Sequence, residues 1–241
     1  MAISANTLFH FTEKEKLKLI LQNNFSPNYR LEDLSNATPP KSRYKQAYIP
    51  MVCFCDLVFS QIKKHIDFYG DYGIGLRKKE WGIERGISPI YYIPKNSISA
   101  HHIQAIAIEI NKKLTKKAEQ AVISEQLQNF YKYVKPYNGK KDDEIFYNER
   151  EWRYVPPDFP VLSKRLNKRR EIDEANANLK KSHKLEFSAK DIKYIVVKDE
   201  NEIPEFVDFI YKKLKNRFFN INDRKILISK LISVNQIEDD M

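Results

Sequence analysis

The distribution of glycine is the sequence feature that most restricts how this chain can fold. Only six of its 241 residues are glycine, and five of these lie between Gly70 and Gly86. Glycine normally makes up about 7% of a protein and is the residue that tolerates tight turns and close backbone approach. The segment FYGDYGIGLRKKEWGIERGISPIYYI therefore predicts one of two features. It is either a place where a ligand meets the backbone, or a glycine-rich hairpin and bulge that shapes a sheet.

Two common nucleotide-binding motifs are missing from the sequence. The spacing Gly70-x-x-Gly73-x-Gly75 differs from the G-x-G-x-x-G fingerprint, and no G-x-x-x-x-G-K-[ST] motif occurs. The glycine segment also lacks a preceding strand that leads into the start of a helix, which both motifs require. These absences argue against a Rossmann or P-loop enzyme.

The charge and the apolar content indicate a soluble, basic protein, and the cysteines indicate a cytoplasmic one. The chain has 42 Lys and Arg against 32 Asp and Glu, hence a formal charge of +10. No run approaches the roughly 18 apolar residues of a membrane-spanning helix, and the opening MAISANTLFHFTEKEK does not resemble a secretory signal. Cys53 and Cys55 form a single C-x-C pair without further cysteines. This pair excludes a disulfide framework and favours buried thiols over a metal site.

The pattern of apolar residues predicts a single α+β domain over residues 1–241. Strands are expected at 8–12, 49–59, 145–155 and 194–197, and helices at 13–23, 102–134 (continuous or broken once) and 203–214. Thr12 is a candidate N-cap of the first helix, with Glu15 completing a capping box. Residues 24–48, with Pro39 and Pro40, read as a long connecting loop, and 162–184 as a basic, solvated excursion. The expected fold is a split, mostly antiparallel sheet flanked by helices.

The segment FYNEREWRYVP carries the residues that most suggest chemistry. Strand alternation would place Glu149, Glu151 and Arg153 on one face. Two carboxylates beside a cation occur in ordinary salt-bridge networks, and the same set also serves acid–base chemistry.

The order of three motifs resembles the ADP-ribosyltransferase fold. LFHFT, the Tyr- and Gly-rich middle and the E-x-E segment follow the order of that fold's His, Tyr and Glu motifs. The resemblance implies NAD as a cofactor and an enzyme that modifies protein or nucleic acid. Glu151 would stabilise the positive charge that develops on the ribose when the bond to nicotinamide breaks. Glu149 would orient or deprotonate the acceptor nucleophile.

The same resemblance assigns the cofactor-binding residues. His10, with Thr12 beside it, would hydrogen-bond the ribose in the other half of NAD. Tyr69 or Tyr72 would stack on the nicotinamide, where the adjacent glycines, Gly73 among them, admit a flat ring. The alternative is structural: His10 between two phenylalanines can be a core histidine, and tyrosines in a chain that has 14 of them can simply pack.

Four longer blocks resemble a second family. PMVCFCDLVFS, YGDYGIGLRKKEWGIERGISPIYYI, FYNEREWRYVP and LEFSAKDIKYIVVKDENEI, in this order, are similar to the AbiGi family of bacterial abortive phage-resistance proteins. The similarity extends roughly from LFHF to IYKKL. It implies an antiviral defence role as the antitoxin or regulator of a toxin–antitoxin pair. The partner it implies is a neighbouring nucleotidyltransferase-like toxin.

A basic segment offers a further candidate binding surface. It carries Lys164, Arg165, Lys168, Arg169 and Arg170, followed by the acids Glu171, Asp173 and Glu174. Phosphates of RNA or DNA would bind such cations, although no helix-turn-helix, zinc-finger or RNP motif is present. A solvated face of mixed charge and a surface for an acidic partner protein are the alternatives.

Overall fold

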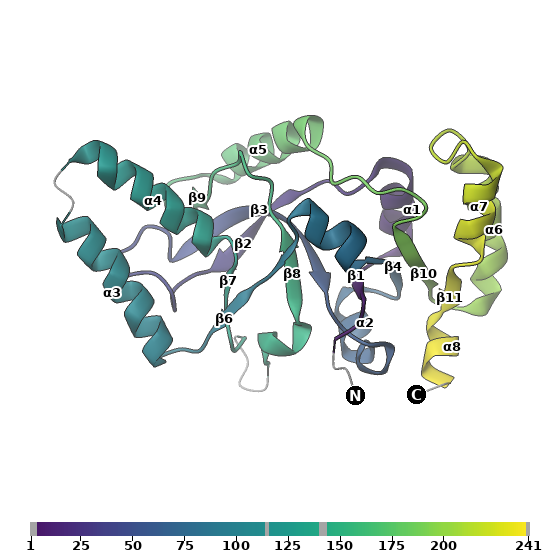
Figure 1. Cartoon of the computed structure of the whole chain (residues 1–241), viewed down its shortest axis with the longest axis horizontal. Helices are drawn as coiled ribbons and strands as arrows, with labels where there is room; N and C mark the ends of the chain where they lie inside the picture. Colours follow the sequence, from purple (N-terminus) through teal and green to yellow (C-terminus); the bar gives the residue numbers. More distant parts are fainter. Residues whose placement is uncertain (1–3, 114–115, 140–143, 240–241) are drawn as a thin grey trace. The chain divides into compact units, whose positions relative to one another are not determined.

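The computed structural model describes residues 4–113, 116–139 and 144–239 (Figure 1). These residues divide into two compact units. The first unit contains the described residues of 1–26, 53–87 and 184–241, and the second those of 27–52 and 88–183. Each unit combines mostly antiparallel strands with helices, so the predicted α+β class is confirmed. A single domain and an ADP-ribosyltransferase-like topology stay predictions.

Among the described residues, four strands lie wholly within the first unit, and they are paired in the order β11-β10-β4-β1. They are β1 (Thr7–Thr12), β4 (Tyr72–Arg77), β10 (Ile192–Val197) and β11 (Leu231–Ser233). The pairs β1–β4 and β4–β10 are antiparallel, whereas β10–β11 is parallel. The predicted strands in LFHFT and YIVV are thereby confirmed.

Five helices belong to the first unit: α1 (Lys14–Asn23), α2 (Lys63–Tyr69), α6 (Ile203–Lys213), α7 (Ile221–Ile228) and α8 (Val234–Asp239). The predicted helices at 13–23 and 203–214 are confirmed within two residues. The predicted capping box is wrong, because Glu13 occupies the N-cap position of α1 and makes no side-chain capping bond. Thr12 instead remains in β1, where it pairs with Tyr72.

Aromatic and aliphatic side chains fill the core of the first unit. Alternate residues of β1 contribute to one cluster with parts of α2, β10 and α8: Phe9, Phe11, Cys55, Leu57, Ile62, Ile66, Val196, Val234 and Ile237. A second group of rings joins Phe25, Phe54 and Phe187, with centroids 5.3–5.5 Å from Phe25. Trp81 lies 5.6 Å from Phe54, is fully buried and donates to the Glu186 carbonyl.

The strands of the second unit are β2 (Asn28–Asp33), most of β3 (Gln46–Cys55), β5 (Ser88–Pro89), β6 (Tyr91–Ile93), β7 (Val134–Pro136), β8 (Glu151–Tyr154) and β9 (Leu162–Ser163). β2 and β9 both pair antiparallel with β3, β5 pairs antiparallel with β8, and β6 pairs parallel with β7. The prediction of a connecting loop over 24–48 is wrong, since β2 and the start of β3 lie within it. Tyr29 explains why such a polar strand forms, because it is buried and its backbone N–H donates to Asn176 Oδ1.

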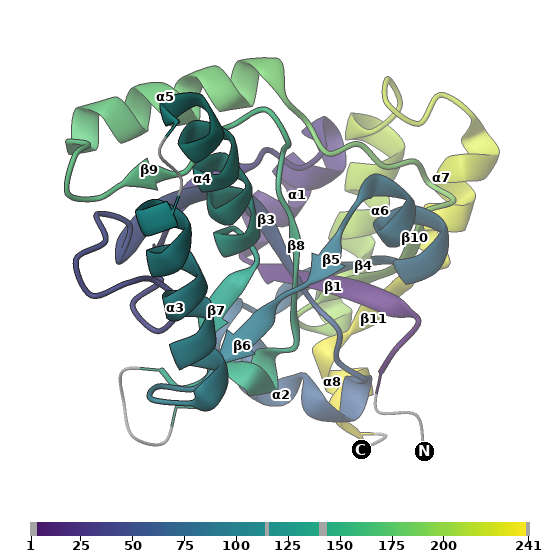
Figure 2. The same ribbon diagram turned by 60° about the vertical axis from the view of Figure 1, so that its left-hand side comes forward.

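Three helices complete the second unit: α3 (Ile98–Lys113), α4 (Lys117–Tyr131) and α5 (Arg169–Ser182). α3 and α4 contact each other (Figure 2). The predicted helical stretch over 102–134 is confirmed in these two helices, and residues 114 and 115 between them lie outside the described residues. The segment 162–184 is more regular than expected, because α5 buries Ile172 and Leu179 against Tyr29. In the part of the chain that the structure describes, no helix combines the length and the apolar character needed to span a membrane.

Candidate functional site

The residues predicted from the first resemblance fall into both units. His10, Thr12, Tyr69, Tyr72 and Gly73 belong to the first unit, whereas Glu149 and Glu151 belong to the second. Antiparallel pairing of β1 with β4 sets Thr12 opposite Tyr72 and Phe11 opposite Gly73. A site shared by the two groups of residues stays a prediction.

The predicted ribose ligand, His10, makes core contacts. Its Nδ1 donates to the Cys53 carbonyl over 2.8 Å, and its ring packs edge-on against Phe25 and Phe54. Tyr69 is 41% exposed, and its ring centroid lies 4.5 Å from that of His65.

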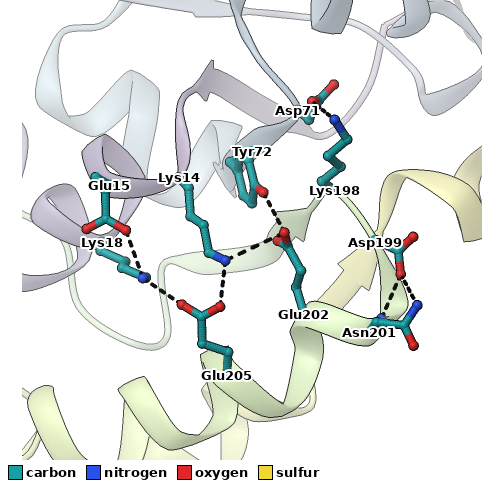
Figure 3. Close-up of polar contacts among 10 residues, drawn as sticks. All are labelled: Lys14, Glu15, Lys18, Asp71, Tyr72, Lys198, Asp199, Asn201, Glu202 and Glu205. Carbon is teal, nitrogen blue, oxygen red and sulfur yellow. Dashed lines mark hydrogen bonds and ion pairs between the residues drawn. The ribbon is translucent and has the colours of Figure 1, made fainter.

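Tyr72 belongs to a polar network between β4, α1 and the start of α6 (Figure 3). Its hydroxyl donates to Glu202 Oε1 over 2.9 Å, and its ring is stacked on Phe206. The same network joins Lys14 and Lys18 of α1 to Glu205, at 2.5 and 2.8 Å. Hydrogen bonds from these two lysines lower the pKa of Glu205. The network anchors α1 to α6 and uses the Tyr72 hydroxyl as a donor.

The two predicted catalytic carboxylates do not share a strand. Glu149 ends a short 3-10 helix, η4 (Phe146–Glu149), and Arg150 has a left-handed conformation with φ of 44°. β8 begins only at Glu151. The prediction of one strand over 145–155 is therefore wrong, because the turn at Arg150 interrupts the alternation. Lys135 nevertheless brings the carboxylates together, since its Nζ lies 2.7 Å from Glu149 Oε2 and 2.9 Å from Glu151 Oε2.

Glu151 is the centre of a buried ion network in the second unit. Its other oxygen, Oε1, accepts from Arg153 Nε over 2.5 Å, and its side chain is 6% exposed. The side chain of Arg153 is fully buried, and it also donates to the Lys132 carbonyl and to Glu32 Oε2 over 3.0 Å each. Three carboxylates and two cations thus give the network a formal charge of −1. We call these five residues, Glu32, Lys135, Glu149, Glu151 and Arg153, the buried ion network.

The charges of the network decide its protonation. Burial by itself raises the pKa of Glu151, but the neighbouring Arg153 and Lys135, through charge and hydrogen bonds, lower it well below its usual range. Burial by itself lowers the pKa of Lys135, but the neighbouring carboxylates of Glu151 and Glu149 raise it by more, so that the net shift is upward. Glu151 is therefore ionised and Lys135 is protonated at neutral pH.

Acid is expected to destabilise the protein through Glu151. Because the pKa of Glu151 is lower in the folded chain than in the unfolded chain, the unfolded state binds the proton more tightly. The stabilisation is complete above the unfolded pKa, near 4.5, and is lost as pH falls towards the folded pKa. Urea unfolding between roughly pH 6 and pH 3 should show this loss, and E151Q should show a shallower pH dependence. Equal pH dependence in the two proteins would contradict the assignment.

To bind NAD in the predicted way, the site needs a carboxylate oxygen that is available to the ribose and an aromatic ring face that is available to the nicotinamide. Both oxygens of Glu151 already accept from Arg153 or Lys135, and the ring of Tyr72 is stacked on Phe206. Glu151 and Tyr72 are thus engaged within the protein, whereas Tyr69, the other predicted stacking residue, is 41% exposed. The transferase activity stays a prediction from the resemblance.

An open, positively charged groove is a candidate binding site of the second unit. Its volume is about 650 Å³. The loop between β2 and β3 forms one side, and the residues after β9 form the other. We call it the basic groove, and it is lined by Asp33, Ser35, Pro40, Lys41, Ser42, Arg43, Lys45, Gln46, Lys164 and Arg165. All five of its cations are exposed.

Sequence reasoning found only part of this groove. Lys164 and Arg165 belong to the predicted basic segment, but Lys41, Arg43 and Lys45 lie in what was expected to be a connecting loop. The cations at alternate positions 41, 43 and 45 were the available signal. Antiparallel pairing of Ala47 with Ser163 brings the two segments together, and this pairing has no signature in the local sequence.

The comparisons with known proteins agree with one another. A family model described as "Putative abortive phage resistance protein AbiGi, antitoxin" matches residues 23–198. The "Abortive phage resistance protein AbiGi" of Lactococcus lactis subsp. cremoris is 31% identical over 249 aligned residues, which cover 90% of this chain and 99% of that protein. No solved structure matches the chain.

Proposed function

Because this chain belongs to the AbiGi family of abortive phage resistance proteins, we propose that it is the antitoxin of an abortive-infection system. The observation that carries the proposal is the extent of the similarity, which covers 99% of the relative from Lactococcus lactis. The matched residues 23–198 also include the buried ion network and the basic groove. The toxin that we propose as its partner is a neighbouring nucleotidyltransferase-like protein, and the pair would act in the cytoplasm.

Co-expression with the neighbouring toxin tests the antitoxin role. Cells that express the toxin alone should stop growing, and cells that also express this chain should grow. A matched control keeps the transcript but replaces an early codon by a stop codon, so that rescue by the protein is separated from rescue by its RNA. Equal growth arrest with and without the protein would overturn the proposal.

Phage plating tests the defence role independently of toxicity. Cells with both genes should plate phage less efficiently than cells that lack them, because abortive infection removes infected cells before phage are released. Cells with the stop-codon control make the toxin without this chain, so they should not give a viable culture that resists phage. Unchanged plating across a panel of phages, together with failed rescue, would place this chain outside toxin–antitoxin defence.

A further inference from the structure

We propose that the basic groove binds the phosphate backbone of a nucleic acid. The groove has five cations and one acid, Asp33, so the formal charge of its lining is +4. Asp33 is already engaged, because its Oδ1 accepts from the Ser35 backbone N–H over 2.9 Å. None of the five cations forms an ion pair with another residue in the described part of the chain. A concave surface with this charge attracts polyanions.

The cations stand on a backbone that is already fixed. Ser163 Oγ donates to the Arg43 carbonyl, and the Leu34 N–H donates to the Lys45 carbonyl over 2.8 Å. Lys164 is fixed from the other side, since its backbone N–H donates to the Gln46 carbonyl over 3.0 Å. Binding should therefore cost little backbone entropy, because mainly the side chains of the groove have to become ordered.

The composition of the lining favours nucleic acid over a protein partner. Stable protein interfaces are centred on buried aromatic or aliphatic anchors. Of the ten lining residues, Pro40 alone is apolar, and the others are charged or are Ser and Gln. The neutral side chains Ser35, Ser42 and Gln46 can donate to phosphate oxygens, as such groups commonly do in protein–DNA contacts.

The size of the groove also favours a chain of phosphates. A volume of about 650 Å³ is far larger than one phosphate group needs. Beyond Arg165, Lys168 and Arg169 follow in the same segment and are exposed as well. We therefore infer a sequence-independent contact with several successive phosphates. This inference goes beyond the antitoxin role and does not depend on it.

The test measures the affinity of the full chain for a 20-nucleotide single-stranded RNA and a 20-base-pair DNA by fluorescence anisotropy across salt concentrations. The groove variant is K41Q/R43Q/K45Q/K164Q/R165Q. The control variant, K64Q/K79Q/K190Q/K213Q/K215Q, loses the same charge from exposed lysines of the first unit. Five contacts should give a log–log slope of about −3.5 for the single strand or about −4.5 for the duplex. The groove variant should lose most of this slope and bind at least about tenfold more weakly, whereas the control should keep most of the slope.

Further arms separate the alternatives. A smaller variant, K41Q/K45Q/R165Q, removes cations with no side-chain hydrogen bond among the described contacts and should lower the single-strand slope by about 2. This smaller variant replaces the five-residue variant in the test if the latter does not fold. Equal loss in the groove and control variants, or no binding to either oligonucleotide, would overturn the proposal. Polyglutamate that binds more tightly than the RNA would identify an acidic protein surface as the ligand instead. Displacement of the RNA by inorganic phosphate at equal phosphate concentration would identify a site for free phosphate.

Discussion

Replacing Glu151 by glutamine is expected to lower the free energy of unfolding by about 3–5 kcal/mol, because it breaks a buried ion pair from one side only. Glutamine has nearly the same size, but it removes one of the two carboxylates that contact Arg153, which is fully buried, and leaves the contact with Glu32. Lys135 likewise loses one of its two carboxylate contacts and keeps the one with Glu149. Urea denaturation at pH 7 measures the loss as a shift of the unfolding midpoint.

The matched control for this prediction is E149Q. The Glu149 side chain is 20% exposed, and after its neutralisation Lys135 still has Glu151. We expect a loss of at most about 1 kcal/mol, as for partly exposed ion pairs. If the two variants unfold at the same urea concentration, Glu151 is not the centre of the network. The stability of E151Q also matters for any test of transferase activity, because an unfolded variant would lose activity whether or not Glu151 is catalytic.

Replacing Gly70 by alanine is the second substitution with a large expected effect. Gly70 ends α2 with φ of +119°, and an added Cβ would lie 2.4 Å from the Thr12 carbonyl oxygen. Thr12 cannot yield easily, because it pairs with Tyr72 in the sheet. Backbone strain of about 1–3 kcal/mol and overpacking of similar size should together cost about 2–6 kcal/mol. Thermal unfolding should report a markedly lower midpoint for G70A.

G86A is the matched control within the same glycine-rich segment. Gly86 also has a positive φ, +74°, but no atom lies within 4 Å of its added Cβ. Only the left-handed backbone is then penalised, by about 1–2 kcal/mol. Similar midpoints for G70A and G86A would mean that close approach to Thr12 contributes little.

The glycine segment illustrates what the sequence could and could not predict. The clustering left a ligand site and a sheet-shaping segment equally open. The predicted strands at 8–12, 49–59 and 194–197 overlap β1, β3 and β10, although β3 already ends at Cys55. The neighbour at close range, however, is the chain itself, because Cβ atoms on Gly73 and Gly75 would lie 2.8 and 2.7 Å from the rings of Phe11 and Phe9. The pattern therefore favours the sheet-shaping interpretation, and the identity of such a neighbour depends on strand register, which one sequence does not reveal.

The misplaced elements have a common physical cause. β2 and β8 are short, and polar residues interrupt their patterns, so their stability comes from pairing with distant strands and from charges such as those of Arg153. Likewise, Glu32 and Glu151 lie 119 positions apart in the sequence, yet both bind Arg153. Apolar residues at spacings of three to five identified the helices α3, α4 and α6. The helix α5 was missed, because its buried residues Ile172 and Leu179 stand among many charged ones.

The division of the units along the chain has a consequence for synthesis on the ribosome. Within the first unit, β4 lies between β1 and β10, yet about 115 residues separate β4 from β10 in the sequence. At about 5–20 residues per second, β1 and β4 emerge many seconds before β10. During that interval one edge of β4 has no partner from β10, and such edges are prone to aggregation. The first unit therefore completes its sheet only late in translation, and a truncated product would expose this edge for the whole of its lifetime.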